Sequence, residues 1–175
     1  MRGVHAVAVM CVAAALVAGC QKQNQAAAPV APAPAAQATY DQTPESNQKF
    51  LADNKAKPGV KTQPSGLQYR VIKAGTGASP QSGEDMVTVT YKGSLIDGKV
   101  FDQTPAGQTA TFPAGQLIAG WVEALSLMKE GEEWELVIPS ELGYGAQGAG
   151  NGVIPPNQTL VFDMTLLKVD PAKTP

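Results

Sequence analysis

The sequence predicts an α+β fold in which a five-stranded antiparallel sheet curls around one short amphipathic helix. Five segments combine β-branched and aromatic residues with the period-two alternation of strands: 67–73, 86–92, 109–112, 132–139 and 159–169. Turns with glycine or proline separate them, such as Asp97-Gly98. A single helix cannot cover both faces of a sheet, which favours an antiparallel over a parallel arrangement.

One helical pattern interrupts the strands, in residues 116–131. Apolar residues recur there at steps of three and four, at Ile118, Trp121, Val122, Leu125 and Met128. We expect Gly131 to end this helix. Taken alone, such a stripe is more typical of a core helix than of a binding site.

The first 20 residues have the pattern of an export signal. Arg2 precedes an apolar run from Ala6 to Ala18, which is shorter than the roughly 20 residues that span a bilayer. The ending Leu16-Val17-Ala18-Gly19-Cys20 resembles the bacterial lipoprotein signal, which implies cleavage after residue 19 and a lipid anchor on Cys20. An ordinary signal peptide with a chance cysteine is the alternative.

Removal of residues 1–19 would limit the chemistry of the mature chain. His5 is the only histidine, and Cys11 and Cys20 are the only cysteines. His5 and Cys11 would be removed with the signal, and the lipid would block Cys20, so the mature chain would have no imidazole and no free thiol. This excludes nucleophilic pairs with histidine and zinc sites of histidine and cysteine. We also expect no other metal and no cofactor.

Composition divides the rest of the chain. Residues 20–44 are rich in alanine, proline and glutamine, which predicts a disordered tether. Residues 45–60 predict a short helix and a connector, residues 61–170 a folded domain, and residues 171–175 a tail.

The short helix is expected over residues 45–55. Thr43-Pro44-Glu45 is a helix start signal, and Lys57-Pro58-Gly59 ends the pattern. Phe50 and Leu51 are its only apolar anchors.

Charge and motif context exclude two classes of ligand. With 13 basic residues, 15 acidic residues and no basic run, the chain lacks the electrostatic footprint of a nucleic-acid-binding protein. The stretch GYGAQGAGNGVIPP (143–156) satisfies the nucleotide-binding pattern G-x-G-x-x-G. However, only six residues separate Gly148 from Pro155-Pro156, so no helix can follow to bind a phosphate. We interpret the stretch as a lid beside an apolar slot.

Six motifs in order carry a family resemblance: Val89-Thr90-Tyr91-Lys92-Gly93, Asp97-Gly98-Lys99-Val100-Phe101-Asp102, Leu117-Ile118-Ala119-Gly120-Trp121, Met128-Lys129-Glu130-Gly131-Glu132, Leu142-Gly143-Tyr144-Gly145, and Val153-Ile154-Pro155-Pro156-Asn157 with Leu160-Val161-Phe162. Through these motifs, residues 61–170 resemble the FKBP-type peptidyl-prolyl cis-trans isomerases. The lead-in Gly59-Val60-Lys61-Thr62 and Pro64-Ser65-Gly66-Leu67-Gln68-Tyr69 is similar to that of the envelope subgroup, the macrophage infectivity potentiator-like isomerases. Members of that subgroup often have a long helical dimerisation region, and only residues 45–56 stand in its place, so we expect a monomer.

The resemblance implies an apolar aromatic pocket with ten assigned residues. Six are expected to be catalytic: Tyr91, Phe101, Asp102, Trp121, Tyr144 and Phe162. Four are expected to bind the substrate: Leu117, Ile118, Val153 and Ile154. Trp121 would be the floor under the proline ring, while the Tyr144 hydroxyl and the Ile154 N–H would hold substrate carbonyls. Taken singly, Asp102 is typical of a turn and Tyr144 of an exposed loop, so the roles depend on the ordered set.

The implied function is rotation of X-Pro bonds in folding envelope proteins, without covalent chemistry, metal or nucleotide. The expected partners are proline-containing polypeptides and the membrane that receives Cys20. Macrocyclic inhibitors are possible ligands, although Ala110 stands where some relatives have a large ring. The expected location is the bacterial envelope, facing the periplasm with the outer membrane favoured over the inner, or the cell surface. The alternatives are a tethered proline-recognition or chaperone module and, as the weakest, a purely structural lipoprotein.

Overall fold

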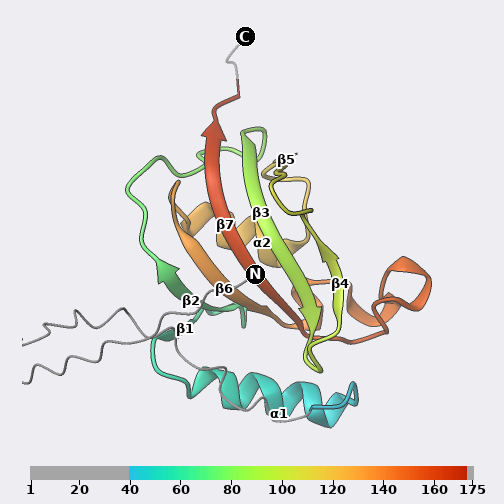
Figure 1. Ribbon diagram of the computed structural model, residues 1–175. Coiled ribbons are helices and arrows are strands. Elements are labelled where there is room, and N and C mark those ends of the chain that lie inside the picture. The colour runs from blue at the N-terminus through green and yellow to red at the C-terminus, as the bar shows by residue number, and fades with distance from the viewer. Residues whose placement is uncertain (1–39, 173–175) are drawn as a thin grey trace, which may run out of the picture. The chain divides into compact units, whose positions relative to one another are not determined.

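A curved antiparallel sheet organises residues 40–172, the part of the chain that the computed structural model describes (Figure 1). Its strands are β1 (Val60–Thr62), β2 (Gln68–Lys73), β3 (Met86–Leu95), β4 (Val100–Gln103), β5 (Ala110–Pro113), β6 (Glu133–Ile138) and β7 (Leu160–Asp170). Within these residues the α-helices are α1 (Pro44–Lys55) and α2 (Ala119–Leu127). Three short 3-10 turns lie between β6 and β7: Ser140–Leu142, Gly145–Gln147 and Gly150–Gly152.

The strand order confirms the predicted fold class and corrects the number of strands. The order is β1-β2-β6-β7-β3-β4, with β5 paired to β3, so residues 40–172 form seven strands rather than five. β1 and β4 were not predicted from the sequence. β1 has three residues and β4 has four, and most of these residues are exposed, so neither strand shows a usable hydrophobic alternation.

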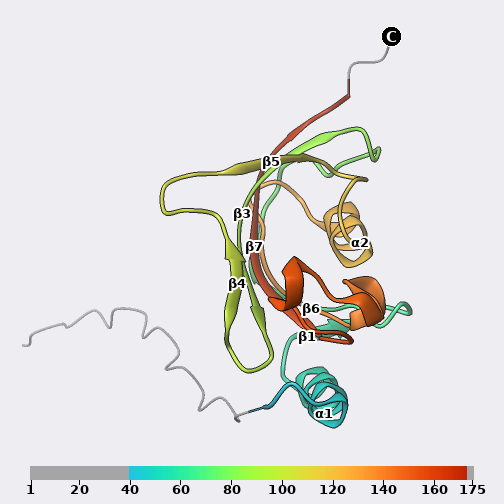
Figure 2. The same ribbon diagram turned by 90° about the vertical axis from the view of Figure 1, so that its right-hand side faces the viewer.

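β4 and β5 pair with different parts of β3. β4 lies against Lys92–Ser94, while β5 lies against Met86–Val89. Residues 104–109 connect the two strands. β4 and β5 therefore lie one beyond the other beside β3 (Figure 2). One aromatic residue from each of β3, β4, β5 and β7 lines the same cavity: Tyr91, Phe101, Phe112 and Phe162.

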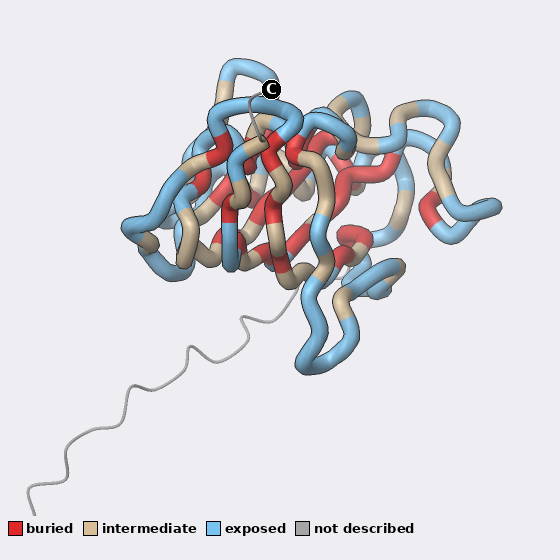
Figure 3. Tube along the Cα trace, turned by 90° about the horizontal axis from the view of Figure 1, so that it is seen from above, coloured by how far each residue is buried: buried red, intermediate tan, exposed pale blue. Residues whose placement is uncertain are grey.

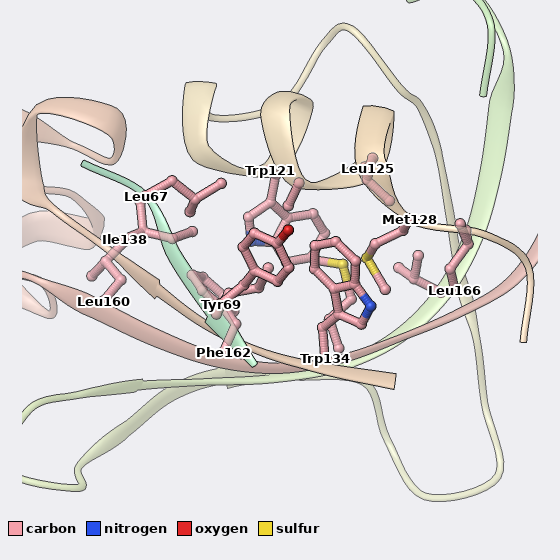
Figure 4. Packing of buried hydrophobic residues seen from close by; sticks show 14 of the residues in the cluster. Leu67, Tyr69, Trp121, Leu125, Met128, Trp134, Ile138, Leu160, Phe162 and Leu166 are labelled. Atoms are coloured by element: carbon pink, nitrogen blue, oxygen red, sulfur yellow. The ribbon is translucent and has the colours of Figure 1, made fainter. Parts of the chain in front are cut away.

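Helix α2 packs on the concave face of the sheet. Trp121, Leu125 and Met128 are buried and point from α2 and its end toward the sheet (Figure 4). Val122, which was expected in the same stripe, is 36% exposed, because it lies roughly 60° around the helix from Leu125. The helix ends at Leu127 rather than at Gly131, and Met128 is already extended with ψ 154°.

The core fills the space between α2 and the central strands. The buried stretches run through the middle of the molecule, whereas the loops are exposed (Figure 3). The largest fully buried side chains include Leu136, Ile138, Leu160, Met164 and Leu166 from β6 and β7. In β7 the buried residues alternate with less buried ones, and this alternation fixes the register of β7 against β6.

The short N-terminal helix begins as the sequence predicts. Thr43 is its N-cap, and the Thr43 hydroxyl accepts a hydrogen bond from the Ser46 N–H at 3.3 Å. Phe50 and Leu51 are only partly buried. The buried residues of α1 are instead Asn47 and Asn54, which the hydrophobic pattern does not reveal.

Several sequence-based expectations fall outside the described residues. These are the signal peptide (1–19), the lipidated Cys20 and most of the tether (20–44). Residues 40–43 at the end of that range are ordered against the domain: the Tyr40 hydroxyl donates to Asp53 Oδ2 at 2.6 Å, and Gln42 Nε2 donates to Asp97 Oδ2 at 2.7 Å. Among residues 40–172, no helix is long and apolar enough to cross a membrane.

Candidate active site

An apolar hollow of about 210 Å³ opens between α2 and the edge of the sheet. Its lining comes from four strands, the start of α2 and the loop after β6: Tyr91, Phe101, Asp102, Phe112, Leu117, Ile118, Trp121, Tyr144 and Phe162. All six residues expected to be catalytic therefore lie around one cavity, together with Leu117 and Ile118.

Trp121 forms the base of this hollow. Its side chain is 5% exposed, and three rings meet it edge to face. The ring centroids lie at 5.0 Å for Tyr91, 5.2 Å for Phe162 and 6.3 Å for Phe112. This arrangement holds the indole rigidly and leaves an aromatic surface toward the opening.

Gly93 allows two of the aromatic walls to meet. It pairs with Phe162 of β7 on one side and with Asp102 of β4 on the other. A Cβ atom at Gly93 would lie 2.6 Å from Phe162 Cε1 and 2.7 Å from Phe101 Cζ, so no side chain fits there. The Phe101 and Phe162 rings pack at 5.5 Å with an interplanar angle of 87°.

The polar groups of the hollow are few and lie at its rim. The Tyr91 hydroxyl donates to Asp102 Oδ2 at 2.7 Å. Burial, and then the hydrogen bond with Asp102, raise the pKa of Tyr91 to about 12. Burial, and then the negative charge of Asp102, also raise the pKa of Tyr144 above its ordinary value. Both phenols are therefore neutral at physiological pH and act as O–H donors.

The loop between β6 and β7 carries Tyr144 and folds back on itself. Ala149 and Ile154 exchange two backbone hydrogen bonds, of 2.9 and 3.0 Å, and the Asn157 N–H donates to the Gly145 carbonyl at 2.8 Å. Gly148 has φ +64°, and a Cβ atom there would lie 2.2 Å from the Ile154 carbonyl oxygen. Glycine is thus required at this close approach.

Two of the expected substrate-binding residues are not part of the hollow's lining. Ile154 is 6% exposed and packs into the core, and its N–H donates to the Ala149 carbonyl at 3.0 Å. The expectation that this N–H is free to hold a substrate carbonyl is therefore wrong for this structure, because the loop itself uses the group. Val153 is 44% exposed on the same loop.

Phe112 is a lining residue that the sequence analysis missed. It lies on β5, two residues after Ala110, so both residues point to the same face of the strand. The sequence contains this information, because residues two apart in a strand share a face. If position 110 faces the pocket, position 112 is expected to face it as well. Phe112 thus supplies an aromatic ring on the face of β5 where Ala110 has only a methyl group.

Two family models and several curated proteins match this chain. The family described as FKBP-type peptidyl-prolyl cis-trans isomerase matches residues 77–167. The domain described as amino-terminal to FKBP-type peptidyl-prolyl isomerase matches residues 8–71. The outer membrane protein MIP of Legionella longbeachae is 53% identical over 124 residues, which cover 70% of this chain and 52% of the relative. The chain spans about half the length of the curated relatives it matches.

Solved structures show the same relationship. A peptidyl-prolyl cis-trans isomerase from Pseudomonas syringae is 42% identical with a TM-score of 0.67, and the match covers 72% of this chain and 92% of that one. FkpA from Escherichia coli is 44% identical with a TM-score of 0.69, over 74% of this chain and 60% of that one. The chain therefore belongs to the FKBP-type peptidyl-prolyl cis-trans isomerase family.

Proposed function

We propose that this chain accelerates cis-trans isomerisation of X-Pro bonds in polypeptides. The observation that carries the proposal is the base of the hollow, where a buried indole is held by three edge-to-face rings below an apolar opening. Membership of the isomerase family and the order of the site motifs support it.

The reaction requires rotation and no bond-making. Rotation about a prolyl amide breaks its resonance, with a barrier of about 18–20 kcal/mol. A planar amide is more polar than a twisted one, so water favours the planar form. A water-poor aromatic surface reverses part of that preference and lowers the barrier, provided that the twisted amide is bound better than the planar one.

Directed donors would hold the carbonyls on either side of the rotating bond. The Tyr144 hydroxyl is neutral and lines the hollow. Ile118 is the N-cap of α2 and also lines the hollow, and the first N–H groups of a helix have no intrahelical acceptor. We assign the backbone donor to this helix start, in place of the engaged Ile154 N–H. Asp102 orients Tyr91 and faces the opening.

A tethered proline-recognition or chaperone module is the second candidate. The exposed Tyr144 at the hollow and the exposed Val153 on the same loop favour it, because exposed apolar residues can hold an unfolded segment without turnover. The two functions differ in whether the rate of isomerisation changes.

The test uses the full 175-residue chain and a proline-containing tetrapeptide. We expect isomerisation to accelerate in proportion to enzyme concentration, with Tyr144→Phe lowering kcat/KM by about threefold to tenfold through loss of one hydrogen bond. Trp121→Leu removes the base and is expected to lower it further. Equal rates with and without the protein would leave only the binding function.

The proposal extends to the cell envelope and to a lipid anchor on Cys20. The lipoprotein-like signal in the sequence supports it, as does the name of the Legionella relative, an outer membrane protein. The anchored chain would act as a monomer on proline-containing envelope polypeptides. Membrane fractionation of the wild-type chain and of Cys20→Ser tests the anchor, since only the wild type should remain with the membrane. Sedimentation of the detergent-solubilised chain tests the monomer.

A further inference from the structure

Helix α1 is attached to the domain by two buried asparagines on one face. Asn47 is 5% exposed and Asn54 is 2% exposed. They are seven residues apart, which is about two helical turns, so both face the same way. α1 lies below the end of the sheet from which the loop between β6 and β7 departs (Figure 1, Figure 2).

Asn47 binds the chain where that loop enters β7. Its Oδ1 accepts a hydrogen bond from the Thr159 N–H at 2.7 Å. Its Nδ2 donates to Gln158 Oε1 at 3.3 Å and to the Thr43 carbonyl at 2.9 Å. Thr159 and Gln158 are themselves buried, at 1% and 5% exposure, so these groups have no bulk water as a substitute partner.

Gln158 extends this contact to the end of the loop. Its Nε2 donates to the Pro156 carbonyl at 3.1 Å and to the Gln42 carbonyl at 3.0 Å. The next residue back, Asn157, donates its N–H to the Gly145 carbonyl at 2.8 Å, beside Tyr144. A continuous set of hydrogen bonds therefore runs from Asn47 to Gly145, the residue that follows Tyr144.

We propose that Asn47 is a positioning residue for the active site, which fixes the loop that carries Tyr144. This rests on the isomerase activity proposed above. The buried Asn47 amide hydrogen-bonds to the Thr159 N–H and to the Gln158 side chain. Any other position of the loop end would leave these buried groups without partners, so one position is favoured. Loss of Asn47 frees the loop end, and a displaced Tyr144 hydroxyl holds the substrate less well.

Asn54 supplies a matched control on the same helix. Its Nδ2 donates to Gln68 Oε1 at 2.9 Å, and Gln68 Nε2 donates to the Leu51 carbonyl at 3.0 Å. Gln68 lies on β2 and pairs with Val137 near the end of β6, but neither the Asn54 nor the Gln68 side chain hydrogen-bonds to residues 139–159. Asn54 thus attaches α1 to the sheet through its amide nitrogen, without a side-chain hydrogen bond to the loop, and its Oδ1 has no hydrogen-bond partner within residues 40–172.

The experiment compares Asn47→Ala and Asn54→Ala in the full chain, measured for thermal midpoint and for kcat and KM on a proline-containing tetrapeptide. Both substitutions are expected to lower the midpoint. Only Asn47→Ala is expected to lower kcat/KM, by about threefold and by no more than Tyr144→Phe, at a temperature where both variants are folded. Amide hydrogen exchange at Asn157 and Ile154 should accelerate in Asn47→Ala and stay unchanged in Asn54→Ala.

A second variant keeps the test decisive if Asn47→Ala fails to fold. Gln158→Met removes the same link from the loop side while keeping the side-chain length, and should reproduce the loss of kcat/KM and the faster exchange. Equal kcat/KM and equal exchange in the Asn47 and Asn54 variants, with an active wild type, would overturn the assignment of Asn47 alone. An inactive wild type would instead overturn the proposed isomerase function, and the positioning role of Asn47 with it.

Discussion

Tyr91 donates its hydroxyl hydrogen to Asp102 Oδ2 at 2.7 Å, and this pair joins β3 to β4 at the rim of an otherwise apolar hollow. The pair leaves the tyrosine neutral, since burial and the hydrogen bond with Asp102 raise the pKa of Tyr91 to about 12. The Tyr91 phenol therefore stays protonated at physiological pH, and its ionisation affects stability only at high pH.

Tyr91 predicts a loss of stability at high pH. Its pKa in the folded protein is about 12, above the value of about 10 in an unfolded chain. The contribution of the neutral phenol is therefore fully present below about pH 10 and is lost as the pH rises toward 12. We expect the thermal midpoint of the wild type to fall relative to that of Tyr91→Phe over this range. A constant difference between the two proteins would contradict it.

Asp85 predicts the opposite dependence at low pH. Its carboxylate accepts backbone hydrogen bonds from Gln81 at 2.7 Å, Ser82 at 3.0 Å and Ala172 at 2.9 Å. The hydrogen bond from Ala172, followed by that from Gln81, lowers the pKa of Asp85.

The stabilisation by Asp85 is thus present above the unfolded carboxyl pKa of about 4 and is lost as the pH falls through the lower folded value. Thermal midpoints of the wild type and Asp85→Asn should differ most at neutral pH and converge in acid. A difference that grows on acidification would show that the carboxylate does not stabilise this end of the chain.

Gly93 predicts a coupled loss of stability and activity. In Gly93→Ala the new Cβ atom would meet the Phe101 and Phe162 rings at less than 3 Å. We expect a loss of about 1–3 kcal/mol in unfolding free energy from overpacking, and a lower kcat/KM because the walls of the hollow separate. Gly107→Ala is the control, because that position has φ +75° but no atom within 4 Å of the new Cβ. Gly107→Ala should lower only the free energy of unfolding and leave kcat/KM unchanged. Equal kcat/KM in Gly93→Ala and Gly107→Ala would contradict the role of Gly93.

Ala110 predicts that the affinity for apolar macrocycles can be increased. It lies two residues before Phe112 and on the same face of β5, beside a hollow that Phe112 lines. A ring at this position adds apolar contact surface, so Ala110→Phe should tighten macrocycle binding by about tenfold in a titration. Thr111→Phe is the control on the opposite face and should leave the affinity unchanged. Equal effects of both substitutions would show that position 110 does not face the ligand.

Much of this fold follows from local sequence patterns. The long strands β3 and β7 are strongly periodic, and their burial mostly alternates as the pattern predicts. The helix around Trp121 was also predicted, although it ends at Leu127 and leaves Val122 exposed. β4 is different. Its position depends on the turn at Asp97-Gly98 and on pairing with β3, and pairing is a tertiary contact that four residues do not encode.

The parts of the site that sequence did not predict depend on backbone geometry. The engagement of the Ile154 N–H arises from a ladder with Ala149 that forms only because Gly148 turns the chain. The anchoring role of Asn47 requires Thr159 to lie beside it, across 112 positions of sequence. Hydrophobic patterns carry no information on such polar contacts, because a buried amide resembles an exposed one until its partner is known.

We propose that the hollow over Trp121 accelerates prolyl rotation without transferring a proton or forming a covalent bond. The most direct measurement is kcat/KM of the full chain on a proline-containing tetrapeptide in H₂O and in D₂O, at matched positions on the pH profile. We predict clear acceleration in both solvents with a ratio close to one. A ratio of about two or more would show that a proton moves in the rate-limiting step, and would contradict catalysis by binding alone.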